Sequence, residues 1–385
     1  MLKHKEIIIG AALLLASPLS FGQTTVIKIG HIGPLTGPQA VIGKDNENGV
    51  RMAIEQLNAK GLNVAGKSVQ FELDSQDDQA DPRQGVTAAQ KLVDDGVVAV
   101  IGPYNSGVAI PASKVFAQAE IPVLTVASNP TVTQQGYKNI VRVGANDGQL
   151  GGRMAEYAYE QLHARTAAVV DDRTAYGKGV ADEFEKVAEK LGFKVVGREY
   201  SNDKAVDFRA ILTKIKPLRP DVIFYGGYAA QGAPLVKQAR QLAMRVKVLG
   251  GDGICSPDMG KVAGAAASDV FCAQSGASLD ASDAGRDFSQ QYLSKFKTQT
   301  QIFGVNFYDA MMLVAEAIQK EGSTDPHKIR AYLASARYKG VAGNYAFTTE
   351  GDLKGAPTTV YTFVDGQIKP AVRATQQPRG GLAAN

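Results

Sequence analysis

Short apolar runs alternate with amphipathic helical patterns along almost the whole chain, and this alternation restricts the fold more than any other feature. In the first half, apolar runs predict buried strands at 26–32, 69–73, 97–101 and 122–126. Between the first two, Val50, Ala53, Ile54 and Leu57 have the spacing of a helix face. Asp81 and Pro82 predict the start of another helix, whose buried face would be Val86, Ala89 and Val93.

The same alternation begins again after Gly144. Apolar runs and periodic patterns predict strands at 167–170, 194–196, 222–225 and 246–249, and helices around 184–191, 207–216 and 232–243. An apolar helix at 310–318 and a strand at 358–364 follow. Repeated strand–helix units predict the α/β class, with parallel sheets covered by helices on both faces, in two doubly wound lobes.

The first 22 residues have the pattern of an export signal. Lys3 and Lys5 precede an apolar stretch at 7–15, and the small residues Ser20 and Gly22 mark a cleavage site near Gly22. The apolar stretch is too short to span a bilayer. We therefore expect an exported protein in the periplasm, with residues 1–22 removed.

The two cysteines, Cys255 and Cys272, lie 17 residues apart. In an oxidising compartment a disulfide between them is the expected state. The alternative is a metal pair, but the histidines that would complete it are scattered. We therefore expect neither a metal nor a cofactor.

Charge and motifs argue against two classes of function. The formal net charge is only +4, without a basic block, so a nucleic-acid partner is not expected. A hydrolase elbow around Ser106 would need glycine where Tyr104 stands, and no phosphate-binding or zinc-binding motif occurs. Asp77 and Asp78 are predicted to be solvated in a charged loop, so we expect no enzyme.

Candidate binding residues follow the strands of the first lobe. Ser106 comes just after the strand at 97–101 and is predicted to cap the next helix, where backbone N–H groups attract anions. Ala127, Ser128 and Asn129 follow the strand at 122–126. Ends of adjacent parallel strands meet in one crevice. The alternative is that Ser106 and Ser128 only cap helices.

Three strand ends of the second lobe carry an acid or an aromatic ring. Tyr176, Tyr228 and Asp252 each follow a predicted strand and are flanked by glycines. Taken alone, each is more easily explained as structural. Together with the anion-binding groups of the first lobe they suit a small zwitterion, of which an α-amino acid is the simplest, held in a cleft that closes by a hinge.

The chain resembles the substrate-binding proteins of branched-chain amino acid ABC transporters, which have the type I periplasmic-binding fold. The resemblance covers residues 24–368 and rests on an ordered set of segments. They are IKIGHIGPLTGPQAVIGKDNENGVRMAIEQLNAKG, DDQADPRQGVTAAQKLV, IGPYNSGVAIPAS, DDRTAYGKG, FYGGYAAQG, LGGDG and GDLKG. It implies two lobes joined by three crossovers, near 146, 276 and 355. Lobe 1 would be 24–146 and 277–355, lobe 2 would be 147–276 and 356–369, and 370–385 would be a disordered tail.

The resemblance also implies roles for individual residues. The first lobe would hold the ligand's carboxylate and ammonium with Ser106, Ala127, Ser128 and Asn129, and Asp252 would complete the ammonium site. The aromatic residues implied at the ligand are Tyr104, Tyr176, Tyr228 and Phe303. The chain departs from the family at several of these positions. Asp252 stands where relatives have Glu, and Asn129 stands where many have Thr. Tyr104 is bulkier than the usual residue at its position, and Ile42 stands where some relatives have an aromatic residue that contacts the ligand. Ala80 and Asn105 replace the relatives' first-lobe disulfide.

The function implied is capture of leucine, isoleucine or valine by a monomer and its delivery to a membrane ABC permease. One alternative is a binding protein for another small carboxylate or an amide, such as urea, a short amide or an aromatic acid. Asp252 argues against this alternative because it supplies a partner for an ammonium group. Another is a ligand sensor of the same fold, which would need a DNA-binding module, a membrane span or a cytoplasmic address.

Overall fold

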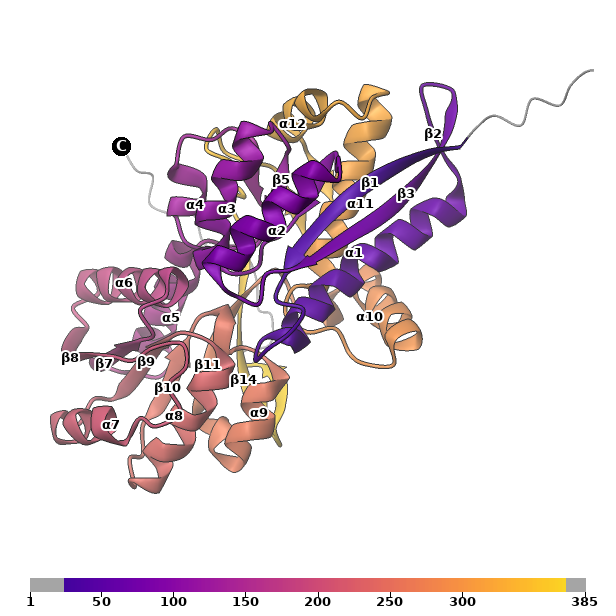
Figure 1. Ribbon diagram of the computed structural model, residues 1–385. Helices are drawn as coiled ribbons and strands as arrows, with labels where there is room; N and C mark the ends of the chain where they lie inside the picture. Colours follow the sequence, from indigo (N-terminus) through magenta and orange to yellow (C-terminus); the bar gives the residue numbers. More distant parts are fainter. Residues whose placement is uncertain (1–23, 372–385) are drawn as a thin grey trace, which may run out of the picture.

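The computed structural model describes residues 24–371, which form two lobes, each built around one sheet (Figure 1). The predicted signal at 1–22 and nearly all of the predicted tail lie outside these residues. Pro370, the first residue of that tail, instead ends a strand.

The first sheet contains six strands in the order β2-β3-β1-β4-β5-β6. Their bounds are β1 Thr25–Gly33, β2 Leu62–Val64, β3 Lys67–Asp77, β4 Ala99–Ile101, β5 Val123–Thr125 and β6 Ile140–Arg142. All neighbours are parallel except β2 and β3, which form a hairpin. Ala65 and Gly66 at its turn both have positive φ, as a two-residue hairpin turn requires.

Helices from two separate parts of the chain cover this first sheet. The first group is α1 Ala40–Lys60, α2 Pro82–Asp94, α3 Ser106–Gln118 and α4 Thr131–Gln134. The second is α10 Asp283–Phe296, α11 Gly304–Glu321 and α12 Pro326–Ser335. The buried face of α11 packs against α1, and Figure 1 shows these later helices, in orange, beside the N-terminal elements.

The second sheet contains seven strands in the order β15-β14-β11-β10-β9-β7-β8. They are β7 Thr166–Asp171, β8 Lys194–Tyr200, β9 Val222–Gly226, β10 Lys247–Gly250, β11 Val270–Ser275, β14 Thr358–Val364 and β15 Gln367–Pro370. The helices of this lobe are α5 Asp147–Glu160, α6 Ala175–Lys190, α7 Arg209–Ile215, α8 Ala229–Gln241 and α9 Pro257–Ala263. A short hairpin, β12 Tyr338–Lys339 with β13 Asn344–Tyr345, stands apart from both sheets.

The α/β prediction is confirmed, but both sheets are mixed rather than wholly parallel. The first sheet contains the antiparallel strand β2, and the second sheet differs at one edge. Strands β14 and β15 run antiparallel and close this edge. Asp365 and Gly366, both with positive φ, form the tight turn between them. The chain therefore returns to the second lobe in its last described strands.

Three local predictions are wrong. Ser106 is the first residue of α3 rather than its cap, because Asn105 has the extended backbone of the cap position. The buried face of α2 differs from the predicted one. Val86 and Val93 are only half-buried, and Gly85, Ala88 and Leu92 are buried together with Ala89.

Asp78 was predicted to be solvated, but it is completely buried. Strand β3 continues to Asp77, so Asp78 lies at the end of the sheet, where its N–H donates to Gly33 O (3.0 Å). Its carboxylate accepts a hydrogen bond from Ala80 N (2.8 Å), and burial raises the pKa of Asp78 to about 7. Asp77 is only partly buried.

Candidate functional site

The predicted binding residues gather between the two lobes around one small cavity. Its lining comes from both lobes and consists of Tyr104, Val126, Ser128, Tyr176, Tyr228 and Asp252. The cavity volume is about 10 Å³, close to the space that one water molecule needs. An amino acid is much larger than that, so it can occupy this place only if side chains or lobes move apart.

Tyrosine rings from both lobes line the cavity. Tyr104 follows β4 of the first lobe, and its ring centroid lies 6.0 Å from that of Tyr228, the residue before α8. Tyr176, in the first turn of α6, lies 5.0 Å from Tyr228. Phe303 does not line the cavity but packs behind Tyr104, with 5.9 Å between the ring centroids. These rings give the cleft an apolar wall.

Ser106 and Asn129 lie beside the cavity rather than on its wall. The Ser106 hydroxyl accepts a hydrogen bond from the backbone N–H of Asn129 (3.1 Å), so it ties α3 to the loop after β5. The Asn129 side chain donates from Nδ2 to Ala175 O in the second lobe (2.7 Å). Its Oδ1 accepts from Thr131 N (2.9 Å). In this arrangement Asn129 therefore joins the two lobes.

Asp252 supplies the only carboxylate among the residues that line the cavity. It follows β10, and only 4% of its surface is exposed. Burial raises the pKa of Asp252 to about 6, and a contact with the Tyr176 hydroxyl offsets part of this effect. The same hydroxyl accepts a hydrogen bond from Gly253 N (2.8 Å). A buried carboxylate of this kind is stabilised by a cationic partner.

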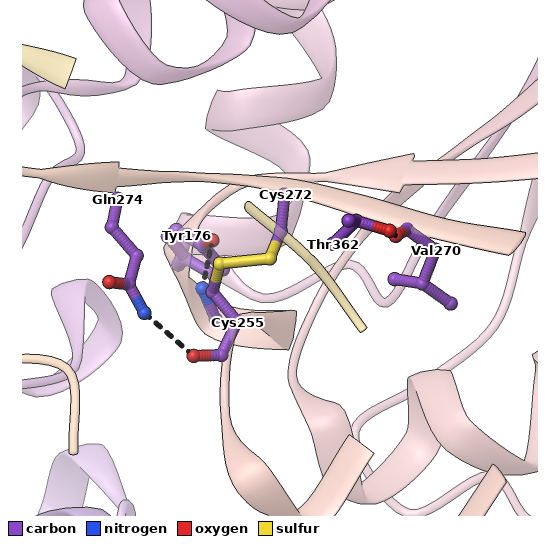
Figure 2. Close-up of a disulfide and its surroundings, with 7 residues drawn as sticks. Tyr176, Cys255, Val270, Cys272, Gln274 and Thr362 are labelled. Atoms are coloured by element: carbon purple, nitrogen blue, oxygen red, sulfur yellow. Dashed lines mark hydrogen bonds between the residues drawn. A yellow bond between two sulfur atoms is a disulfide. The ribbon is translucent and has the colours of Figure 1, made fainter. Parts of the chain in front are cut away.

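The disulfide between Cys255 and Cys272 is present, as predicted (Figure 2), and Cys255 comes three residues after Asp252, at the end of the same short turn. The disulfide joins the turn after β10 to strand β11, with 5.5 Å between the Cα atoms. Gln274 donates to Cys255 O from the same strand (2.8 Å). The turn that carries Asp252 is thereby attached to the sheet.

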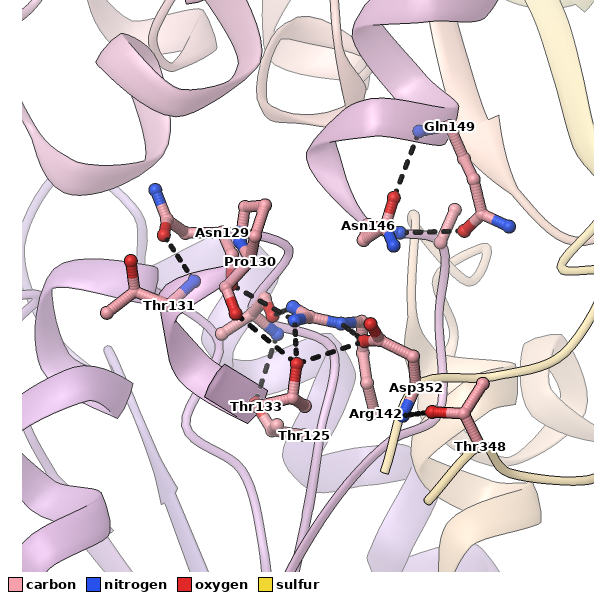
Figure 3. A network of polar contacts seen from close by, with 12 residues as sticks. Thr125, Asn129, Pro130, Thr131, Thr133, Arg142, Asn146, Gln149, Thr348 and Asp352 are labelled. Carbon is pink, nitrogen blue, oxygen red and sulfur yellow. Dashed lines mark hydrogen bonds and ion pairs between the residues drawn. The ribbon is translucent and has the colours of Figure 1, made fainter. Parts of the chain in front are cut away.

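Sequence reasoning missed two charged residues next to the site. Arg142, at the end of β6, is completely buried and contacts the loop 127–129 (Figure 3). Asp147, at the start of α5, is also completely buried, and burial, together with the nearby charge of Asp252, raises its pKa to about 8. Val126 was missed as well. The sequence did contain a signal for Arg142: an arginine inside the apolar run IVRV indicates a buried charge that needs polar partners.

Two kinds of feature are absent from residues 24–371. Within this range, no cluster of three or more histidine, cysteine, aspartate or glutamate side chains has the arrangement of a metal site. None of the helices in the described part of the chain is long and apolar enough to cross a membrane.

A cleft between two α/β lobes, lined by side chains from both, defines a two-lobed binding protein. The sequence model of the family described as "Periplasmic binding protein" matches residues 26–367. The chain belongs to this family, which confirms the family resemblance expected from the sequence.

Individual relatives agree with this assignment. The chain is 33% identical over 368 residues to the Leu/Ile/Val-binding protein BraC3 of Rhizobium johnstonii, covering 94% of this chain and 97% of that one. It is 32% identical to a leucine-, isoleucine-, valine-, threonine- and alanine-binding protein of Pseudomonas aeruginosa, covering 92% and 94%. The crystal structure of a leucine-binding protein from Thermotoga maritima superposes with a TM-score of 0.83 at 27% identity, covering 90% and 98%.

Proposed function

We propose that this protein captures an α-amino acid with a branched aliphatic side chain in the cleft between its lobes and delivers it to an ABC permease in the membrane. It would act as a monomer in the periplasm. The observation that carries the proposal is the cavity itself, in which a buried carboxylate and three aromatic rings share the wall with Val126 and Ser128 at the end of β5.

Each end of an amino acid has a matching group. Asp252, buried and without a cationic partner in the cavity wall, suits the ammonium group. Ser128 and the first turn of α3, which begins at Ser106, offer hydroxyl and N–H donors to the carboxylate. The rings of Tyr104, Tyr176 and Tyr228 suit an aliphatic side chain.

Movement of the lobes is part of the proposal. The chain would cross between lobes near 146, 276 and 355, and these crossings would act as the hinge. Because the ligand contacts both lobes, it would bind the closed arrangement better and favour it. The names of the relatives, which include leucine, isoleucine and valine, support the choice of side chain.

A thermal-shift screen tests the function. The protein is unfolded and refolded to remove any ligand carried through purification. Each of the twenty amino acids is then added separately, and aromatic acids, urea and short amides are added in parallel samples. We expect leucine, isoleucine or valine to raise the melting temperature, since a ligand at about 100 times its Kd stabilises by roughly 2.7 kcal/mol. A response only to aromatic acids, urea or short amides would overturn the proposal in favour of another small carboxylate or amide.

A further inference from the structure

Arg142 lies beneath the loop 127–129 with its whole side chain buried. We propose that Arg142 is a positioning residue, which orients the Ser128 backbone N–H toward the ligand's carboxylate. Asp352, in the segment leading to β14, holds the Arg142 guanidinium in place. This inference rests on the proposed function, because it assigns a role in the same site.

Arg142 contacts the loop 127–129, helix α4 and the segment that carries Asp352 (Figure 3). Its guanidinium donates to Ala127 O, and Nη2 donates to Asn129 O (3.0 Å) and Thr133 Oγ1 (3.1 Å). Its Nε pairs with Asp352 Oδ1 (2.8 Å). One side chain therefore fixes the carbonyl groups on both sides of Ser128.

The peptide plane connects these contacts to the site. In a trans peptide the C=O of one residue and the N–H of the next point in opposite directions. With Ala127 O turned toward Arg142, the N–H of Ser128 must point away from it. Ser128 itself lines the cavity. The guanidinium thus determines the direction of a donor at the cavity wall.

This N–H is the free donor of the loop. Ala127 N donates to Thr125 Oγ1 (3.0 Å), and Asn129 N donates to Ser106 Oγ (3.1 Å). Among residues 24–371, Ser128 N has no hydrogen-bond partner. A buried N–H without a partner is costly, and a carboxylate oxygen would satisfy it with a charge-assisted bond.

Asp352 keeps the guanidinium in this position. It is mostly buried, and its backbone N–H donates to Thr348 Oγ1 (3.2 Å) while its carboxylate also accepts from Thr133 Oγ1 (3.2 Å). Arg142 N donates to Gly351 O (2.8 Å). Strand β6 is therefore joined to the segment 351–352 by this backbone hydrogen bond as well as by the ion pair between Arg142 and Asp352. A fully buried arginine needs such a partner.

The test compares Asp352→Asn with wild type, using leucine and leucinamide as ligands. Asp352→Asn removes the ion pair but keeps the side-chain size. We expect the preference for leucine over leucinamide to fall roughly tenfold, because the bond from Ser128 N–H to a charged oxygen is weakened. We also expect the Ser128 amide resonance, which shifts when leucine binds to wild type, to shift much less in the variant.

The matched control is Asp269→Asn, which breaks the pair between Asp269 and Lys247 in the second lobe. It should leave both readouts unchanged. Asp352→Glu, which keeps the charge, should restore part of the preference.

The outcomes separate this inference from the proposed function. An Asp352→Asn protein that binds both ligands more weakly by the same factor, with a normal Ser128 shift, would overturn the positioning role and leave the function intact. Wild type that binds no amino acid would overturn the proposed function instead.

Discussion

Asp252 is the residue on which recognition of an amino acid depends most. Replacing it, as Asp252→Ala, leaves a ligand ammonium without its partner in a closed site, which we expect to weaken binding by roughly 2–5 kcal/mol. Ser106→Ala should weaken binding less, by about 1.5–3 kcal/mol at most, because backbone N–H groups remain. Calorimetry with leucine measures both. Equal binding by Asp252→Ala and wild type would contradict the assignment.

The protonation of Asp252 predicts a pH dependence. Burial raises its pKa to about 6, and the ammonium requires the ionised form. Affinity for leucine should therefore change by less than about twofold between pH 7 and pH 6 and fall at lower pH, by about tenfold for each further unit. Titrations between pH 7 and pH 5 measure this. Asp252→Asn, which does not titrate, should give a flat profile, and a flat wild-type profile would argue against the role of Asp252.

At the scale of single residues, five of the nine binding residues expected from the sequence line the cavity, and the buried charges behind it were not predicted. Tyr104, Ser128, Tyr176, Tyr228 and Asp252 all follow strands, and the ends of parallel strands meet at one edge. The environments of Asp78, Arg142 and Asp147 are set by segments distant in sequence, such as Asp352 for Arg142. Local patterns carry no information about such pairing.

Among the elements, the disulfide supports the turn that presents Asp252. Replacing both cysteines, as Cys255→Ala with Cys272→Ala, should lower the free energy of unfolding by about 3 kcal/mol, since the bridge closes a loop of this length in the unfolded chain. Denaturant titration measures the change, and wild type with a reductant is the control. An unchanged free energy of unfolding would show that the bridge adds no stability.

Most strands and helices of the repeating units were predicted from the sequence, whereas the short strands β2, β12, β13 and β15, which form hairpins, were not. The apolar runs at 97–101, 122–126 and 222–225 form strands β4, β5 and β9, which lie in the interior of a sheet and are buried on both faces. Strands β2 and β15 are short edge strands, and they form only because a tight turn folds them onto a longer neighbour. The Asp365–Gly366 turn was a usable signal for the second of these.

For the whole molecule, the structure predicts a change of shape on binding. The cavity in this closed arrangement is too small for an amino acid, so we expect the free protein to populate a more open arrangement that admits one. A ligand that contacts both lobes then favours closure around itself. Small-angle X-ray scattering should show a smaller radius of gyration with saturating leucine than without ligand. An identical radius in both states would contradict closure by the hinge.

We expect the cleft to recognise an amino acid by both its charged ends. Isothermal titration of the refolded protein with leucine, and separately with 4-methylpentanoate, which lacks the ammonium group, tests it most directly. We predict one leucine bound per chain and binding of 4-methylpentanoate that is weaker by the same roughly 2–5 kcal/mol expected for Asp252→Ala. Equal affinity for the two compounds, or no binding of leucine, isoleucine or valine, would show that the cleft does not recognise both charged ends of such an amino acid.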